Sequence, residues 1–203
     1  MRRMPLLIVA LACLVVFPAL AQTPPQGTPV RVRGTVDKLD GKTLTVKLKD
    51  GQTQSVTLAD DVNVNFLVKK TLADLKPGDT VASTGIKGTD GKIHAIEVRI
   101  LPKPFADGGR QFPWDLSPDS VMTNATLGTV TKTTDGAILH VTFKEGEADY
   151  AVGPDTLIFA HSPGDTGLLV PGAAIVLFAV KQEDGKITSR GLVVEKDGIK
   201  PPM

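Results

Sequence analysis

Cysteine is almost absent from this chain of 203 residues. The single cysteine, Cys13, lies close to the N-terminus, so the sequence beyond it contains no thiol. Disulfides, thiolate nucleophiles and thiolate metal sites are therefore excluded from that part of the chain, and its stability has to come from packing. Aromatic residues are also few, at 4% of the sequence, so their positions are informative.

Catalytic motifs are missing as well. The sequence has no G-x-S-x-G, no H-E-x-x-H and no phosphate-binding glycine loop that opens a helix. We therefore expect a protein that is not an enzyme and that needs no cofactor. The 23 basic and 22 acidic residues nearly balance. A specific nucleic-acid-binding domain is expected to be strongly basic, so we expect no specific nucleic-acid binding.

The N-terminus has the pattern of an export signal. Arg2 and Arg3 precede an apolar stretch that ends at Phe17, and Ala19-Leu20-Ala21 forms a small-x-small cleavage site. We expect residues 1–21 to be a cleaved signal peptide, which predicts a periplasmic or secreted protein with no transmembrane span in the mature chain. An uncleaved anchor and lipidation of Cys13 are the alternatives.

After a flexible tether at residues 22–29, the pattern is that of strands. Segments such as "VRVRGTV" and "LTVKL" alternate apolar and polar residues, and Asp-Gly pairs at 40–41, 50–51 and 90–91 predict tight hairpin turns. Gly41 is expected to adopt the left-handed conformation. The segment "TLADLKPGD" predicts one short helical turn before Pro77. We expect an all-β fold.

The pattern occurs twice, which predicts a tandem duplication at residues 30–101 and 126–200. Order and spacing are both retained at an offset of 94 positions. The matching segments are Gly34-Thr35-Val36 with Gly128-Thr129-Val130, Pro77-Gly78 with Pro171-Gly172, and Asp90-Gly91 with Asp184-Gly185. A Pro-rich aromatic linker at 102–125, which holds the only tryptophan, is expected to pack against the barrels.

The segments "RGTVDKLDGKTLTVKLKDG", "LADLKPGDTV" and "GTDGKIHAIEVRI" resemble a domain of unknown function in exported bacterial proteins, usually described as OB-like. The match is good over residues 30–101 and loose over 126–196. The resemblance implies two small OB-like β-barrels and no catalytic residues. Chains of this kind are sometimes labelled "metal ABC transporter permease", but a permease needs several apolar spans. A soluble role in metal handling remains an expectation from that label.

A basic hairpin is the main candidate binding site. Alternation places Arg31 and Arg33 on the outer face of the first strand, and Lys47 and Lys49 on the outer face of the second. The expected register sets Arg33 opposite Lys47 and Arg31 opposite Lys49, or one pair further along. Like charges across strands are destabilising unless an anion lies between them. The alternative is a solvated face that discourages aggregation.

Metal binding has three candidate residues, His161, Asp165 and His94. Each histidine lies in its own segment, and none has a second histidine or a cysteine at a metal-ligand spacing. His161 and Asp165 in "HSPGD" could hold an ion in a loop, although a simple turn is the alternative interpretation. His94 and Glu97 point to opposite faces of one strand, so they do not chelate together.

These observations predict a non-catalytic binding protein of the bacterial cell envelope. Its expected partner is an envelope protein or an anionic polymer that contacts the first barrel. One alternative is a soluble periplasmic accessory protein that binds a divalent metal. A second alternative is a structural spacer within an envelope complex.

Overall fold

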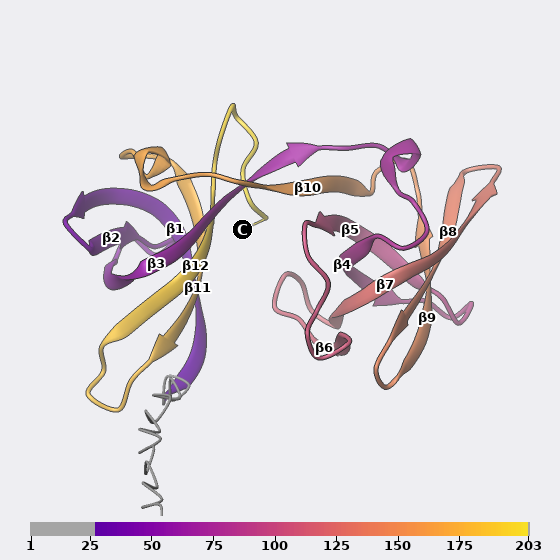
Figure 1. Ribbon diagram of the computed structural model, residues 1–203, viewed down its shortest axis with the longest axis horizontal. Helices are drawn as coiled ribbons and strands as arrows, with labels where there is room; N and C mark the ends of the chain where they lie inside the picture. Colours follow the sequence, from indigo (N-terminus) through magenta and orange to yellow (C-terminus); the bar gives the residue numbers. More distant parts are fainter. Residues whose placement is uncertain (1–26, 203) are drawn as a thin grey trace, which may run out of the picture.

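The computed structural model describes residues 27–202, and it confirms the predicted all-β class (Figure 1). The predicted signal peptide, Cys13 and most of the tether lie outside the described residues. Within residues 27–202, no helix has the length and apolarity needed to cross a bilayer. The strands form two lobes that lie side by side, and two strands run between them.

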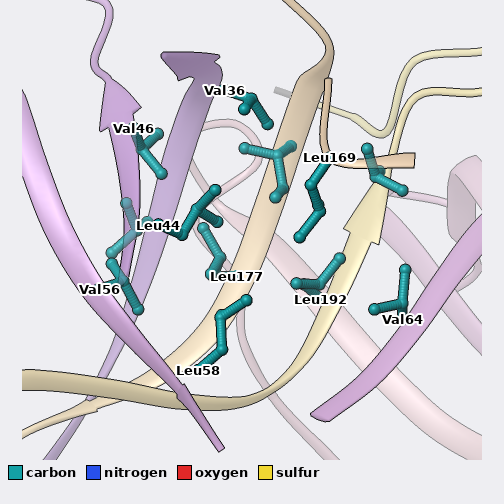
Figure 2. Close-up of a cluster of buried hydrophobic side chains, with 12 residues drawn as sticks. Val36, Leu44, Val46, Val56, Leu58, Val64, Leu169, Leu177 and Leu192 are labelled. Atoms are coloured by element: carbon teal, nitrogen blue, oxygen red, sulfur yellow. The ribbon is translucent and has the colours of Figure 1, made fainter. Parts of the chain in front are cut away.

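The first lobe, which we call barrel A, is a closed five-stranded β-barrel. Its strands are β1 (Thr28–Asp40), β2 (Thr43–Lys47), β3 (Thr53–Lys69), β11 (Ala174–Lys181) and β12 (Ile187–Val194). Parallel pairing of β12 with β3 closes the ring. Aliphatic side chains from alternate positions fill the interior, among them Leu44, Leu177 and Leu192 (Figure 2). The period-two alternation of the sequence thus places one face of each strand in this core.

The second lobe, barrel B, has the same ring of neighbours. Its strands are β4 (Thr80–Lys87), β5 (Ile93–Leu101), β7 (Ser120–Thr133), β8 (Gly136–Phe143) and β9 (Gly146–Val152). Parallel pairing of Ile93 with Tyr150 and of His94 with Ala151 closes the ring. Leu139, Val141 and Tyr150 are fully buried in its core.

Each barrel combines strands from both predicted repeats, which differs from the predicted units 30–101 and 126–200. The hairpin β4–β5 follows barrel A in the sequence but pairs with β7 and β9, while β11–β12 returns to pair with β1 and β3. The cause is the length of β3, which runs for 17 residues and carries the chain into the other lobe. Strand β10 (Leu157–Pro163) makes the return crossing, and it pairs with β3 and β5.

The predicted turns and the predicted helical turn are confirmed, unlike the assignment of one barrel to each repeat. Gly41 has a φ of 54°, and Gly51 and Gly91 also have positive φ in their turns. The predicted helical turn is the 3₁₀ helix η1 (Leu72–Asp74), and η2 (Thr166–Leu168) lies at the corresponding place after β10. Local turn chemistry was therefore read correctly from the sequence, because it depends only on neighbouring residues.

The linker is ordered, as the sequence predicted. Residues Arg110–Pro113 form a short strand, β6, which pairs antiparallel with the start of β7. Gly109 makes this approach possible, because it has a φ of 77° and a Cβ there would overlap the carbonyl oxygen of Asn124. The C-terminal segment returns between the lobes, where Pro201 is buried (Figure 1).

Candidate functional site

An ion pair joins barrel A to the linker of barrel B. The guanidinium of Arg33 on β1 donates two hydrogen bonds to the carboxylate of Asp115, at 2.7 and 2.9 Å. Arg31, two residues earlier on the same face, lies 3.6 Å from the same carboxylate. The hydrogen bond from Arg33 lowers the pKa of Asp115, so this carboxylate is charged at neutral pH. A fork-to-fork contact of this kind fixes orientation as well as distance.

Arg31 also stacks on the only tryptophan of the chain. Its guanidinium carbon lies 3.8 Å from the centroid of the Trp114 ring, and Phe112 meets the same ring edge-on with centroids 5.8 Å apart. Burial lowers the pKa of Arg31, while the charge of Asp115 opposes that shift. The linker therefore holds a guanidinium against an aromatic wall, an arrangement in which the cation is attracted by the ring face.

A second, deeper ion pair lies on β5. Glu97 is fully buried and Arg99 is 8% exposed, and the guanidinium of Arg99 contacts one carboxylate oxygen of Glu97. The hydroxyl of Thr84 donates a hydrogen bond to the same oxygen at 3.0 Å. Both side chains lie on the outer face of barrel B. Arg99 lines a cavity together with Trp114 of the linker and Phe178 of barrel A, so packing between the lobes covers its side chain.

A pocket of about 250 Å³ lies between the two barrels. Four aromatic side chains contribute to its wall, three from the linker and one from β11: Phe105, Phe112, Trp114 and Phe178. Its polar lining comes from Arg31, Arg99, Asn124 and His161. Barrel A, barrel B, the linker and the crossing strand β10 all contribute to this interbarrel pocket, so it exists only because the two lobes are held together.

A smaller cavity of about 10 Å³ adjoins this region and is lined by Arg33, Arg99 and Trp114, among others. Its volume is about that of one water molecule. The Nε atoms of both arginines and Nε1 of Trp114 are buried donors with no partner in the protein. Arg33 lines this smaller cavity and not the larger pocket, whose charged or titratable groups are Arg31, Arg99 and His161.

His161 is the titratable group of the pocket that lies on the crossing strand. Burial, followed by the charge of Arg99, lowers the pKa of His161 to about 4. The imidazole is therefore neutral at pH 7, and its buried Nε2 has no partner in the protein. The positive charge of the pocket comes from arginine rather than from histidine.

The structure brings three residues of the predicted basic cluster to one groove and leaves Lys47 outside it. Arg31 and Arg33 lie together, but they pair with Phe178 and Val176 on β11 rather than with the lysines. Lys47 lies opposite Thr35, so the predicted pairing of Arg33 with Lys47 is wrong, and the ladder has the alternative register, one pair further along. Strand β2 ends at Lys47, and Lys49 follows in the turn. An open groove of about 480 Å³ is lined by Arg31, Arg33 and Lys49, among others, while Lys47 is exposed elsewhere.

The three candidate metal ligands lie in separate environments. The carboxylate of Asp165 accepts a hydrogen bond from the backbone N–H of Gly167 at 2.7 Å and so caps η2. His94 contacts Asp90 in the β4–β5 turn, with Nε2 3.2 Å from the carboxylate. Within residues 27–202, no three side chains of His, Cys, Asp or Glu are grouped so that they could hold a metal ion. The turn interpretation of "HSPGD" therefore fits Asp165.

Sequence reasoning missed most of the pocket. Glu97 and Arg99 alternate with apolar residues along β5, which is the pattern of a solvent-facing strand surface. The packing of the linker and barrel A beside Arg99 has no counterpart in that local pattern. No sequence pattern around Asp115 indicates that it belongs to a site. The concentration of aromatic residues in the linker was the one usable sign, since it indicated that this segment packs against the barrels.

No protein-family model matches the chain, and neither the curated proteins nor the solved structures contain a significant match to it.

Proposed function

We propose that the protein is a non-catalytic binding protein that holds an anionic ligand in the interbarrel pocket. The observation that carries the proposal is a charge excess. Three guanidinium groups, of Arg31, Arg33 and Arg99, meet two carboxylates, of Glu97 and Asp115. A partly buried cation without a counter-charge is costly, and an anionic ligand would supply that charge.

The architecture supports a binding role because it fixes the walls of the pocket. The crossing strands β3 and β10 tie the barrels together through ladder hydrogen bonds. The contact of Arg33 with Asp115 then fixes the linker against β1. A pocket whose walls are positioned before binding loses less entropy when the ligand enters.

The proposal keeps the expected ligand chemistry but moves the site. The expected surface used Lys47 and Lys49 together with the arginines, whereas the interbarrel pocket uses Arg31 with Arg99. We further propose that the barrels are OB-like, as the resemblance implies, and that the protein acts in the cell envelope after export. The ligand would then be a small anion of the envelope, either free or carried as a side group by an envelope polymer or protein.

Thermal unfolding of the purified protein tests this function. The panel contains organic carboxylates, inorganic phosphate, polyphosphate and divalent metal chlorides. A ligand at a hundredfold excess over its Kd stabilises the native state by about 2.7 kcal/mol, which raises the midpoint. We expect a rise with at least one anion, and we expect it to shrink in Arg31→Gln. Lys47→Gln, which removes the same charge outside the pocket, is the matched control.

The same panel distinguishes the alternatives. A rise with a divalent metal alone would favour the metal-accessory role, and a flat panel would favour the spacer. An anion effect that is lost in Lys47→Gln but retained in Arg31→Gln would place binding outside the pocket and overturn the proposal.

A further inference from the structure

We infer that the ligand of the interbarrel pocket is a planar organic monoanion, with one or two rings and a single carboxylate. This inference rests on the proposed function and adds the chemical class of the ligand. Three observations carry it: the size of the pocket, the nature of its walls and the number of charges around it.

The size limits the ligand to a small molecule. A cavity of about 150 Å³ lined by apolar side chains holds one benzene molecule. The interbarrel pocket has about 250 Å³. It can therefore enclose one or two rings with a carboxylate, while a long acyl chain or an oligomer would extend out of it.

The walls favour a flat, apolar body. The chain has nine aromatic residues, seven Phe, one Trp and one Tyr, and four of them line this pocket. Phe178 remains 41% exposed although it is a large apolar side chain on β11. Aromatic rings gain about 0.5–1.5 kcal/mol per pair from offset or edge-on contact beyond the burial of area. A ring entering the pocket would meet such partners on the linker side and on the β11 side.

The charges favour one carboxylate. The excess described above amounts to a single positive charge, so one negative charge balances it. Glu97 does not line the pocket, whereas Arg31 and Arg99 do. Guanidinium groups match the two oxygens of a carboxylate in spacing and direction. Neutral His161 adds a buried Nε2 that can donate a hydrogen bond in one tautomer.

Intrinsic fluorescence gives a direct test, because Trp114 is the only tryptophan and lies in the pocket wall. The full chain is titrated with 2-naphthoate, benzoate, cyclohexanecarboxylate, benzyl alcohol and inorganic phosphate, with thermal unfolding as a second measurement. We expect saturable changes with the two aromatic carboxylates. Cyclohexanecarboxylate should bind about fivefold to tenfold more weakly, from the loss of aromatic contact. Benzyl alcohol and phosphate should bind more weakly still.

Variants link the signal to the pocket. Phe178→Leu keeps an apolar side chain but removes the ring. It should therefore weaken the binding of 2-naphthoate more than the binding of cyclohexanecarboxylate. Arg31→Gln should weaken the binding of both carboxylates, and Lys47→Gln should change the binding of neither. These substitutions lie on the outer face of the barrel, where folding depends on them little.

The outcomes separate this inference from the proposed function. If phosphate or cyclohexanecarboxylate binds as tightly as 2-naphthoate, and Arg31→Gln weakens it, the ligand class is wrong while the anion pocket stands. If benzyl alcohol binds as tightly as benzoate, or if no anion changes either measurement, both the ligand class and the proposed function fall.

Discussion

Leu67 and His161 face each other across β3 and β10, and they occupy equivalent positions 94 residues apart in the two repeats. The ladder is symmetric about this pair, because Asn65 lies opposite Pro163 and Phe159 lies opposite Lys69. The same relation appears in the parallel ladders. Asn63 pairs with Gly191, and Leu157, 94 positions after Asn63, pairs with Glu97, 94 positions before Gly191. A pseudo-twofold axis thus passes through the crossing, and the chain resembles a strand-exchanged dimer fused into one polypeptide.

The strand exchange can be checked by crosslinking. Thr28 and Lys181 are Cα partners at the ends of β1 and β11. In a Cys13→Ser background, Thr28→Cys with Lys181→Cys should form an intramolecular disulfide. Its entropic effect should raise the free energy of unfolding by up to about 5 kcal/mol, since the closed loop is long. Thiol titration and the unfolding midpoint, each with and without reductant, measure both effects.

A matched control uses the equivalent residue of the other hairpin. Lys87 lies at the end of β4, 94 positions before Lys181. If each repeat formed its own barrel, Thr28 would lie beside Lys87 instead. Efficient crosslinking of Thr28→Cys with Lys87→Cys, and none with Lys181→Cys, would show that the barrels are not exchanged.

Removal of the Asp115 carboxylate should loosen the linker. Asp115→Asn loses the bidentate contact with Arg33, which should lower the free energy of unfolding by about 1 kcal/mol at pH 7, a modest value because Asp115 is partly exposed. The pKa of Asp115 is lowered by folding, so its contribution is present above the unfolded value of 3.8 and is lost as pH falls below it. Denaturant unfolding of both proteins at pH 7 and pH 3 measures the difference.

That difference should therefore shrink at pH 3. Asp119→Asn, in the same linker but with no ion pair in the structure, serves as a control for the substitution itself. An undiminished difference at pH 3 would show that the contact is not the source of the stability.

His161 should make stability depend on pH in the acid range. Its pKa is lowered to about 4 in the folded protein, compared with 6.5 for the unfolded chain. Because the unfolded state takes up the proton first, stability is full above pH 6.5 and falls as pH drops from 6.5 to 4. The loss should reach about 3 kcal/mol, from 1.36 kcal/mol per pKa unit. Comparing the pH dependence of unfolding in the native protein and His161→Gln isolates this contribution.

If the free energy of unfolding changed equally between pH 6.5 and 4 in the native protein and in His161→Gln, the result would contradict the burial of this imidazole. His94→Gln is the matched control, because His94 is an exposed histidine near the start of β5. The loss of stability attributed to His161 should persist in His94→Gln.

Tyr150 should resist deprotonation. Its hydroxyl lies 2.7 Å from Oγ1 of Thr123 and 3.1 Å from the carbonyl oxygen of Ser83, and burial raises its pKa to about 12. Since Tyr150 is the only tyrosine, the ultraviolet absorbance of the phenolate reports on it alone. We expect no phenolate signal at pH 10.5 unless denaturant is added. Tyr150→Phe should cost about 1–2 kcal/mol, because Thr123 loses a buried partner.

The sequence was sufficient for the strands and turns but not for the choice of partners. Alternating apolar residues and Asp-Gly pairs act over a few neighbours, so Gly41 and η1 were predicted correctly. The β4–β5 and β11–β12 hairpins share one sequence pattern, so the local sequence does not determine which barrel each hairpin joins. The alignment of the two repeats in the sequence was also wrong at one place. Gly172 donates to the carbonyl of Val36 at 2.8 Å as Gly78 does to that of Leu127 at 2.7 Å, so Val36 corresponds to Leu127 rather than to Val130.

The candidate site shows the same limit. Arg31 and Arg33 were correctly expected on an outer face, because alternation with Val32 decides it. Their real partner, Asp115, is 82 residues from Arg33 and lies in a segment without periodicity. Contacts between lobes depend on the global path of the chain, and no local pattern encodes that path.

Barrel A also sets the order in which the molecule can be completed. Strand β1 is among the first described segments of the chain, yet its neighbour β11 begins at Ala174 and the closing strand β12 ends at Val194. A chain emerging from its N-terminus can therefore pair β1 with β2 and β2 with β3, but the other edges of β1 and β3 stay unpaired until β11 and β12 are available. Barrel B, whose strands all lie between residues 80 and 152, can close earlier. Contacts so distant in sequence make folding slow, and a product truncated before β11 would leave the edges of β1 and β3 open to aggregation.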